Sequence, residues 1–182
     1  MSDKSLHNLT YFLQFTGRLK QIKRTGWIEA GLTQSESVAD HTYRTTILSM
    51  ILADIESLDT LKILRMSLLH DLPEAIIGDL TPSQKTKETK EKETEAMCQI
   101  LNTIPEIQMK LYLSTWNEYK EGKTKEAKLV QQIDKIEMAL QAKEYSNFCS
   151  PKNSLDKFIK TAKETTYWPE LKRFLSNLLE ES

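Results

Sequence analysis

The amino-acid sequence predicts an all-α fold, a single-domain helical bundle formed by a chain of 182 residues. Apolar residues recur at three- and four-residue spacing almost everywhere, which is the period of amphipathic helices. Only 5 glycines and 5 prolines are present, about half the usual share, and this scarcity favours long helices over turn-rich sheets. Because neither strand alternation nor an internal repeat is visible, we expect residues 1–182 to form one domain.

The helices are expected in a definite order along the chain. The first ends near Lys20, and residues 21–36 then form a loop that is longer than usual, a kind of segment that is often functional. Ser37 and Asp40 form a capping box that begins the second helix. The third helix, at about 59–72, is apolar nearly all round and is therefore expected to be buried at the centre. Later helices are expected at about 96–101, 105–120, 124–146, 155–164 and 168–180.

Residues 83–95 contain no apolar side chain. A helix that is polar all round is either solvated or not stably formed, so we expect a mobile segment here that leads into the helix at 96–101. Because this segment follows Asp79 closely, a lid over a site at that residue is a further hypothesis.

Composition excludes several classes of function. The net charge is −1, which excludes binding of a nucleic-acid polymer through bulk charge. No apolar stretch approaches the roughly 18 residues of a membrane span, and the residues after Met1 show no signal-peptide pattern. Cys98 and Cys149 lack metal or redox spacing and are expected to be small apolar residues. We therefore expect a cytoplasmic protein in a reducing compartment.

The dipeptide His70-Asp71 lies at the end of the most apolar helix, and the burial of apolar surface does not explain why two polar residues occur there. A buried aspartate is costly unless it is paired or coordinates a metal. The alternative interpretation is a histidine satisfied within the core and an aspartate that caps the next helix.

Two further residues favour a metal site. His41 lies one turn inside the second helix, and Asp134 lies within a later apolar stripe. Two histidines and two aspartates supply nitrogen and oxygen ligands for one divalent ion. Because they come from three helices, the ion would lie in the core of the bundle. Four ligands leave positions open for water and a phosphate oxygen, as catalysis requires.

Two carboxylates follow the dipeptide. Glu74 is four residues after His70 and is expected on the same side if the helical path continues across Pro73. A carboxylate near a metal site can orient a water or shuttle a proton. Asp79 lies on a loop that could overhang the site. For both residues, a solvated acid is the alternative interpretation.

Several sequence blocks together resemble the HD-domain phosphohydrolases, whose defining ligands follow the order H…HD…D. The blocks are ESVADH (36–41), HDLPEAIIGD (70–79) and IDKIEMALQAKEY (133–145). The narrower resemblance is to the 5′-deoxynucleotidase branch. It depends on RTGW (24–27), on the spacing of Glu74 and Asp79, and on WNEYKEG (116–122) with EAKLV (126–130). The resemblance covers about residues 10–145, and the C-terminal helices at 155–180 lie beyond it.

The resemblance implies a role for each matching residue. His41, His70, Asp71 and Asp134 match the metal ligands, and Glu74 matches the catalytic acid. Asp79 matches the residue that contacts the deoxyribose and helps to exclude a 2′-hydroxyl group. Arg24 matches an arginine at the phosphate, and Trp27 matches an aromatic residue near the nucleotide.

The sequence departs from the family pattern at Arg24 and Trp27. These two residues are adjacent in the bacterial enzyme, whereas Thr25 and Gly26 separate them here. At most one of them aligns without a gap. The alternatives are a core anchor for Trp27 and a solvated cation for Arg24.

The sequence thus predicts a homodimeric enzyme that converts deoxynucleoside 5′-monophosphates to deoxynucleosides and phosphate. One divalent ion per subunit is expected. The sequence does not determine its identity, which could be cobalt, manganese, zinc, iron or magnesium. Two alternatives are an HD phosphohydrolase for a cyclic nucleotide or a nucleoside triphosphate, and a non-catalytic scaffold with a structural ion. A diiron oxygenase is disfavoured because only His7, in a polar stretch, remains for a second metal site.

Overall fold

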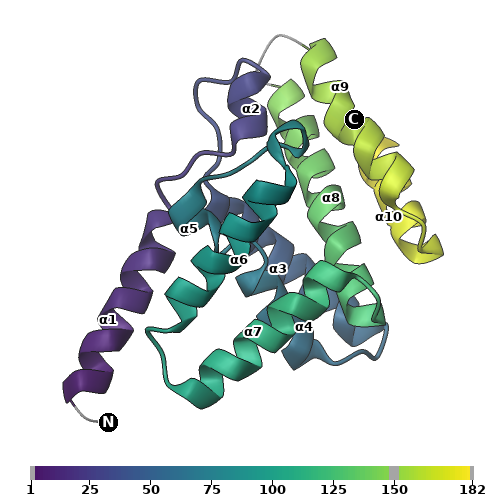
Figure 1. Cartoon of the computed structure of the whole chain (residues 1–182). Coiled ribbons are helices and arrows are strands. Elements are labelled where there is room, and N and C mark those ends of the chain that lie inside the picture. Colours follow the sequence, from purple (N-terminus) through teal and green to yellow (C-terminus); the bar gives the residue numbers. More distant parts are fainter. Residues whose placement is uncertain (1–2, 148–151, 181–182) are drawn as a thin grey trace.

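The computed structural model describes the backbone of residues 3–147 and 152–180, and the side chains of 8–147 and 155–180. The expectations for Cys149 and for the side chain of His7 lie outside these residues. The all-α prediction is confirmed, because the described residues form helices and no strand, apart from one isolated antiparallel bridge between Lys23 and Ser37. Figure 1 shows the helices crossing one another at varied angles.

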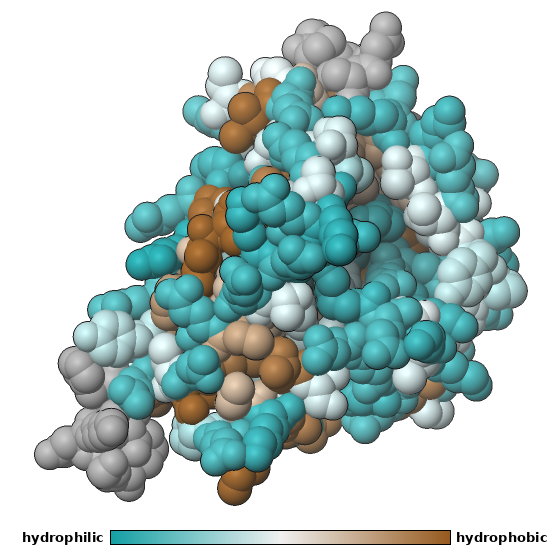
Figure 2. All heavy atoms as spheres, in the orientation of Figure 1, coloured by the Kyte–Doolittle hydropathy of each residue, from teal (hydrophilic) through white to brown (hydrophobic). Residues whose placement is uncertain are grey.

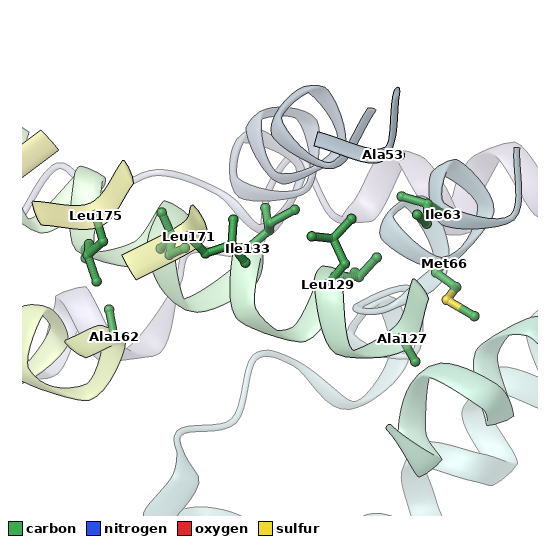
Figure 3. Packing of buried hydrophobic residues seen from close by; sticks show 12 residues of the cluster. Ala53, Ile63, Met66, Ala127, Leu129, Ile133, Ala162, Leu171 and Leu175 are labelled. Atoms are coloured by element: carbon green, nitrogen blue, oxygen red, sulfur yellow. The ribbon is translucent and has the colours of Figure 1, made fainter. Parts of the chain in front are cut away.

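Helix α8 (Lys125–Ser146) is the central support of the fold. Helices α3 (Val38–Ile55) and α4 (Thr60–Leu69) pack on one part of it, and α9 (Lys152–Thr165) and α10 (Pro169–Glu180) on another. Figure 3 shows the resulting core, in which residues of α8 such as Leu129 and Ile133 lie between Ile63 of α4 and Leu171 of α10. This burial holds α3, α4 and α8, which carry the predicted ligands, in one rigid arrangement.

The start of α3 is capped as expected. The Ser37 hydroxyl accepts a hydrogen bond from the backbone of Asp40, and the Asp40 carboxylate accepts one from the backbone of Ser37. The segment before it differs from the predicted loop, because a short helix α2 (Thr25–Glu29) lies within residues 21–36. The backbone N–H of Arg24 donates to Glu36 at 3.2 Å, so both ends of this segment are held beside α3.

The predicted third helix is shorter than expected. Helix α4 ends at Leu69, and the chain turns through His70-Asp71 into the single-turn helix α5 (Glu74–Ile77). Pro73 precedes α5, and Gly78 follows it with φ of 79°, a left-handed value that suits glycine. The turn moves Asp71 and Glu74 off the axis of α4. A 3₁₀ turn (Pro82–Gln84) then leads to α6.

The expected helix at 96–101 begins too late, because α6 spans Lys87–Leu101 and includes most of the segment 83–95. Mobility of that segment stays a prediction. The polar first half of α6 begins with a capping box between Thr86 and Thr89. Glu93 forms an ion pair with Lys120 of α7 (Glu106–Glu121), which ties the polar half to a neighbouring helix. Local caps and ion pairs therefore replace the apolar face that this stretch lacks. A lid remains a hypothesis.

The remaining helix, α1 (Asp3–Arg18), packs against α5 and α6. Figure 2 shows that this face of the molecule is largely hydrophilic, with apolar residues along its left margin as well as in its lower part. Among the described residues, no helix is both long and apolar enough to cross a lipid bilayer.

Candidate functional site

Two buried histidines meet where the start of α3 approaches the end of α4, with ring centroids 5.5 Å apart. Each ring places its Nδ1 atom against an acceptor. His41 contacts the carboxylate of Glu137, and Nδ1 of His70 lies 2.6 Å from the carbonyl oxygen of Ser67. In each ring Nδ1 therefore carries a proton, and in the neutral ring Nε2 holds a lone pair. Both Nε2 atoms are buried without a hydrogen-bond partner among the described residues.

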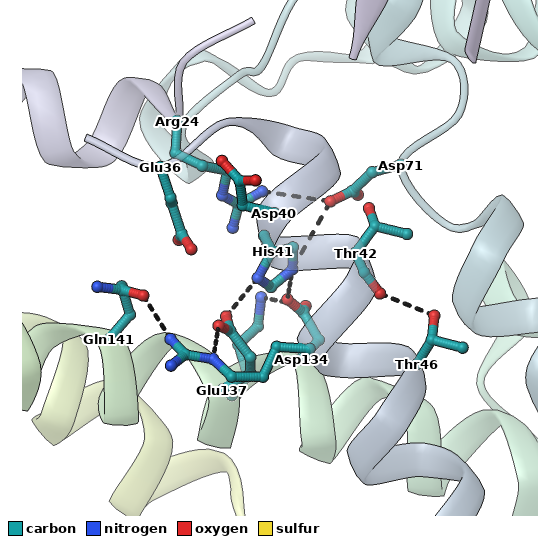
Figure 4. Close-up of polar contacts among 12 residues, drawn as sticks. Arg24, Glu36, Asp40, His41, Thr42, Thr46, Asp71, Asp134, Glu137 and Gln141 are labelled. Carbon is teal, nitrogen blue, oxygen red and sulfur yellow. Dashed lines mark hydrogen bonds and ion pairs between the residues drawn. The ribbon is translucent and has the colours of Figure 1, made fainter. Parts of the chain in front are cut away.

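Carboxylates surround these Nε2 atoms. Asp71 Oδ2 lies 3.0 Å from His70 Nε2 and 3.8 Å from His41 Nε2. Asp134 Oδ1 approaches from α8 and lies 3.1 Å from His41 Nε2. Figure 4 shows His41 between these two aspartates on one side and Glu137 on the other. The structure thus brings together all four residues that the sequence singled out, and their nitrogen and oxygen donors fit a divalent cation.

The electrostatic environment of His41 also favours a cation. Burial and the charge of Arg24 lower the pKa of His41, but Glu137 and Asp134 outweigh them and raise it to about 10. A proton and a metal ion compete for the same lone pair. A ring that attracts a proton this strongly lies in a negative field, which a divalent ion would satisfy.

Arg24 and Asp79 lie at the edge of this cluster. Nη1 of Arg24 is 3.2 Å from Asp71 Oδ2 and 3.1 Å from Asp79 Oδ1, and the arginine side chain is only 14% exposed. Burial lowers the pKa of Arg24, but the two aspartates outweigh it and raise the pKa above its usual range. The Asp79 carboxylate also accepts a hydrogen bond from the backbone of Thr25. Arg24 is therefore a fixed cation beside the candidate ligands rather than a solvated one.

Trp27 is 1% exposed. Its indole N–H donates to Glu36 at 2.8 Å, and its ring contacts those of Tyr145 and Phe158. The side chain thus anchors α2 in the core and also lines the cavity described below. Its contact with a nucleotide stays a prediction.

Glu74 is 6% exposed, and its Oε2 atom has no hydrogen-bond partner among the described residues. Burial raises the pKa of Glu74 well above its usual range, and the negative charges of Asp71 and Asp79 raise it further. The carboxyl group therefore favours its protonated form more than an exposed glutamate does, which suits a general acid.

Sequence reasoning left Glu137 without a definite role and missed Arg44. Glu137 is completely buried, and its Oε1 atom accepts a hydrogen bond from Arg44 Nε at 2.8 Å. Arg44 also reaches Gln141 and Glu144, so it joins α3 to three positions along α8. The spacing offered a signal, because Arg44 and Glu137 each lie three residues, about one turn, after a predicted ligand.

Glu36 lies on the same side of the His41 ring. One oxygen of Glu36, one oxygen of Glu137 and one ring nitrogen of His41 form a second group of atoms within 4.8 Å of one another. Glu137 is already bound to Nδ1 and to Arg44, so we assign the candidate metal position to the Nε2 side. Burial and the charge of Glu137 raise the pKa of Glu36 to about 7.

A cavity of about 590 Å³ opens onto the cluster. His70, Asp71 and Asp134 are among its lining residues, and so are Met138 and Phe158, which pack with Trp27 in one apolar cluster. Five basic and six acidic side chains line it in all. The formal charge of the lining is therefore −1, so a divalent ion would make the cavity positive and attractive to an anion.

Several known proteins are similar to this chain. The family model described as HD domain matches residues 16–172. Human 5′-deoxynucleotidase HDDC2 is 35% identical over 97% of this chain and 87% of its own length. The protein of the same name from Dictyostelium discoideum is 42% identical over 77% of this chain and 78% of its own length. A crystal structure from Pyrococcus horikoshii superimposes with a TM-score of 0.77 at 27% identity, covering 92% of this chain and 96% of that one.

Proposed function

The chain belongs to the HD-domain family, and we propose that it is a metal-dependent 5′-deoxynucleotidase that converts deoxynucleoside 5′-monophosphates to deoxynucleosides and phosphate. One observation carries the proposal: two unbonded histidine Nε2 atoms and two aspartates converge at the end of a cavity beside a buried, unpartnered Glu74. Relatives named 5′-deoxynucleotidase, 32–42% identical, support the substrate class.

In this proposal His41, His70, Asp71 and Asp134 hold one divalent ion. When bound, the ion supplies positive charge that acidifies a water molecule and polarises the phosphate. Arg24 lies 3.2 Å from Asp71, so its guanidinium is placed to bind a phosphate oxygen beside the ligands and to stabilise charge that develops during transfer.

The remaining assignments concern the proton and the sugar. Glu74 donates its proton to the leaving 5′-oxygen or takes one from the attacking water. Asp79 is fixed by bonds from Arg24 and from the backbone of Thr25, so it can contact the deoxyribose and oppose a 2′-hydroxyl group. Trp27 contacts the base end of the nucleotide.

The test is phosphate release from a panel of nucleotides. Chelator-stripped protein is resupplied separately with cobalt, manganese, magnesium, zinc or iron(II). Each deoxynucleoside 5′-monophosphate is compared with its ribose counterpart, and with 3′-monophosphates, triphosphates and cyclic nucleotides. We expect metal-dependent release that favours the deoxy 5′-monophosphates, while chelation leaves most helicity intact. Activity on another panel member would discard the substrate class. Loss of folding on chelation, with no hydrolysis, would indicate a structural ion.

We also propose that the enzyme is a cytoplasmic homodimer in which residues 1–182 form one HD domain per subunit. Exposed apolar side chains lie at every fourth position of α3, which places them on one face: Tyr43, Ile47, Ile51 and Ile55. A face of this kind supports association with a second copy. Light scattering should show a dimer that Ile51→Glu weakens, and a monomer at all concentrations would refute the dimer.

A further inference from the structure

We propose that α9 builds the base end of the nucleotide site, where the ring of Phe158 contacts the nucleobase together with Met138. This inference rests on the proposed function and adds residues of α9, a helix to which the sequence assigned no role in the site. It follows from a cavity whose lining includes both the candidate ligands and the apolar cluster of Trp27, Phe158 and Met138, and from the packing that fixes Phe158 there.

The position of Phe158 is tightly determined. Its ring centroid lies 4.1 Å from that of Trp27, and the side chain is 9% exposed while it lines the cavity. Gly26 makes this approach feasible, because a Cβ atom at that residue would lie 3.2 Å from Phe158 Cε1 and 3.3 Å from Cζ. The ring therefore packs against bare backbone of α2, and its place depends on a glycine.

Helix α2 joins these two sets of lining residues. Arg24 immediately precedes this helix and bonds Asp71 and Asp79, whereas Trp27, about one helical turn later, contacts Phe158. A ligand that fits both sets therefore carries an anionic group and, a short distance away, a flat apolar group. A nucleoside monophosphate has these two groups, with the sugar between them.

The chemistry of Phe158 and Met138 also predicts how strongly the site discriminates among the nucleobases. An aromatic ring and a thioether offer no directional donor or acceptor, and contacts between bases and aromatic side chains are sequence-tolerant because every base has a π face. We therefore expect Phe158 to raise the affinity for nucleotides with any base, and to contribute nothing to a sugar phosphate without a base.

The experiment compares a nucleotide with its baseless counterpart. The substrates are deoxyadenosine 5′-monophosphate and 2-deoxyribose 5-phosphate, and the variants are Phe158→Ala and Phe158→Leu. Lys160→Ala is the matched control, because Lys160 also lies on α9 but its side chain is 76% exposed and does not line the cavity. Circular dichroism checks that each variant is folded. If Phe158→Ala is unfolded, the kinetic comparison is made with Phe158→Leu instead.

We expect Phe158→Ala to lower kcat/KM for the nucleotide about tenfold, mainly through KM, as the loss of one base–aromatic contact requires. Activity on 2-deoxyribose 5-phosphate should stay within about twofold, and Lys160→Ala should change neither substrate. Calorimetry with deoxyadenosine should show weaker binding to the Phe158 variants. Equal loss on both substrates, or none on the nucleotide, would overturn the inference. A wild-type protein that releases phosphate from no panel nucleotide would instead refute the proposed function.

Discussion

Replacing Glu137 by glutamine should weaken the metal site without disturbing the fold. The carboxylate of Glu137 accepts hydrogen bonds from two donors, His41 Nδ1 and Arg44 Nε. The two donors reach different oxygens of the carboxylate, and glutamine has an NH₂ group in place of one of them, so only one donor keeps its acceptor. If its oxygen faces Arg44, its NH₂ group faces His41 and favours the tautomer with the proton on Nε2. That tautomer cannot bind a metal through Nε2.

The structure sets the size of the effect. One hydrogen bond to a charged group is lost, and such bonds contribute about 1.5–3 kcal/mol. That energy corresponds to roughly 10- to 100-fold in metal affinity, the range typical of partners that orient metal-binding histidines. In the opposite orientation the amide oxygen faces His41 and the tautomer is kept. The NH₂ group of the glutamine then faces the N–H group of Arg44, so a hydrogen bond is lost in this orientation as well.

The assay is a cobalt titration followed by visible absorption, with thermal unfolding of the chelated protein measured in parallel. Nitrogen NMR of His41 reports the tautomer. Glu144→Gln is the matched control, because Glu144 also bonds Arg44 but is 44% exposed. It should change cobalt affinity less than about threefold, since the hydrogen bonds of exposed groups contribute little.

Unchanged cobalt affinity in a folded Glu137→Gln variant would refute the reasoning. An equal loss of cobalt affinity in Glu144→Gln would also refute it, because the effect would then come from the removal of one negative charge and not from the orientation of His41.

Other substitutions test the neighbouring structure. The raised pKa of Glu36, about 7, means that the folded state binds the extra proton between pH 4.5 and 7, so stability falls as pH rises through that window. Glu36→Gln should therefore be more stable than wild type by up to about 3 kcal/mol above pH 7 in urea unfolding, and a gain that is independent of pH would contradict this. Thr86→Ala should cost about 1 kcal/mol and speed amide exchange at 87–95, whereas unchanged exchange there would show that the cap is dispensable. Met66→Ala, at a fully buried position of α4, should cost about 2–5 kcal/mol in urea unfolding, and a smaller loss would indicate that the core collapses around it.

The sequence by itself determined most of the helices and singled out the four candidate ligands. Apolar periodicity and the Ser37–Asp40 capping box depend on contacts within one or two turns, so they can be read from neighbouring residues. The histidines and aspartates could be singled out because a polar group on a buried apolar face costs free energy unless it is paired or binds a ligand. Helix α6 shows the limit of the same local argument, since its polar half is also held by an ion pair between Glu93 and Lys120 of another helix.

The tertiary structure decided how these residues meet. Arg44 and Glu137 are 93 positions apart, and Arg24 and Asp71 are 47 apart. Their pairing depends on how α3, α4 and α8 pack, and no local pattern specifies that packing. The same packing encloses Glu74 and brings Phe158 of α9 against Gly26. Burial, which raises the pKa of Glu74 and shapes the cavity, is a property of all the surrounding helices together, so it emerged only once they were assembled.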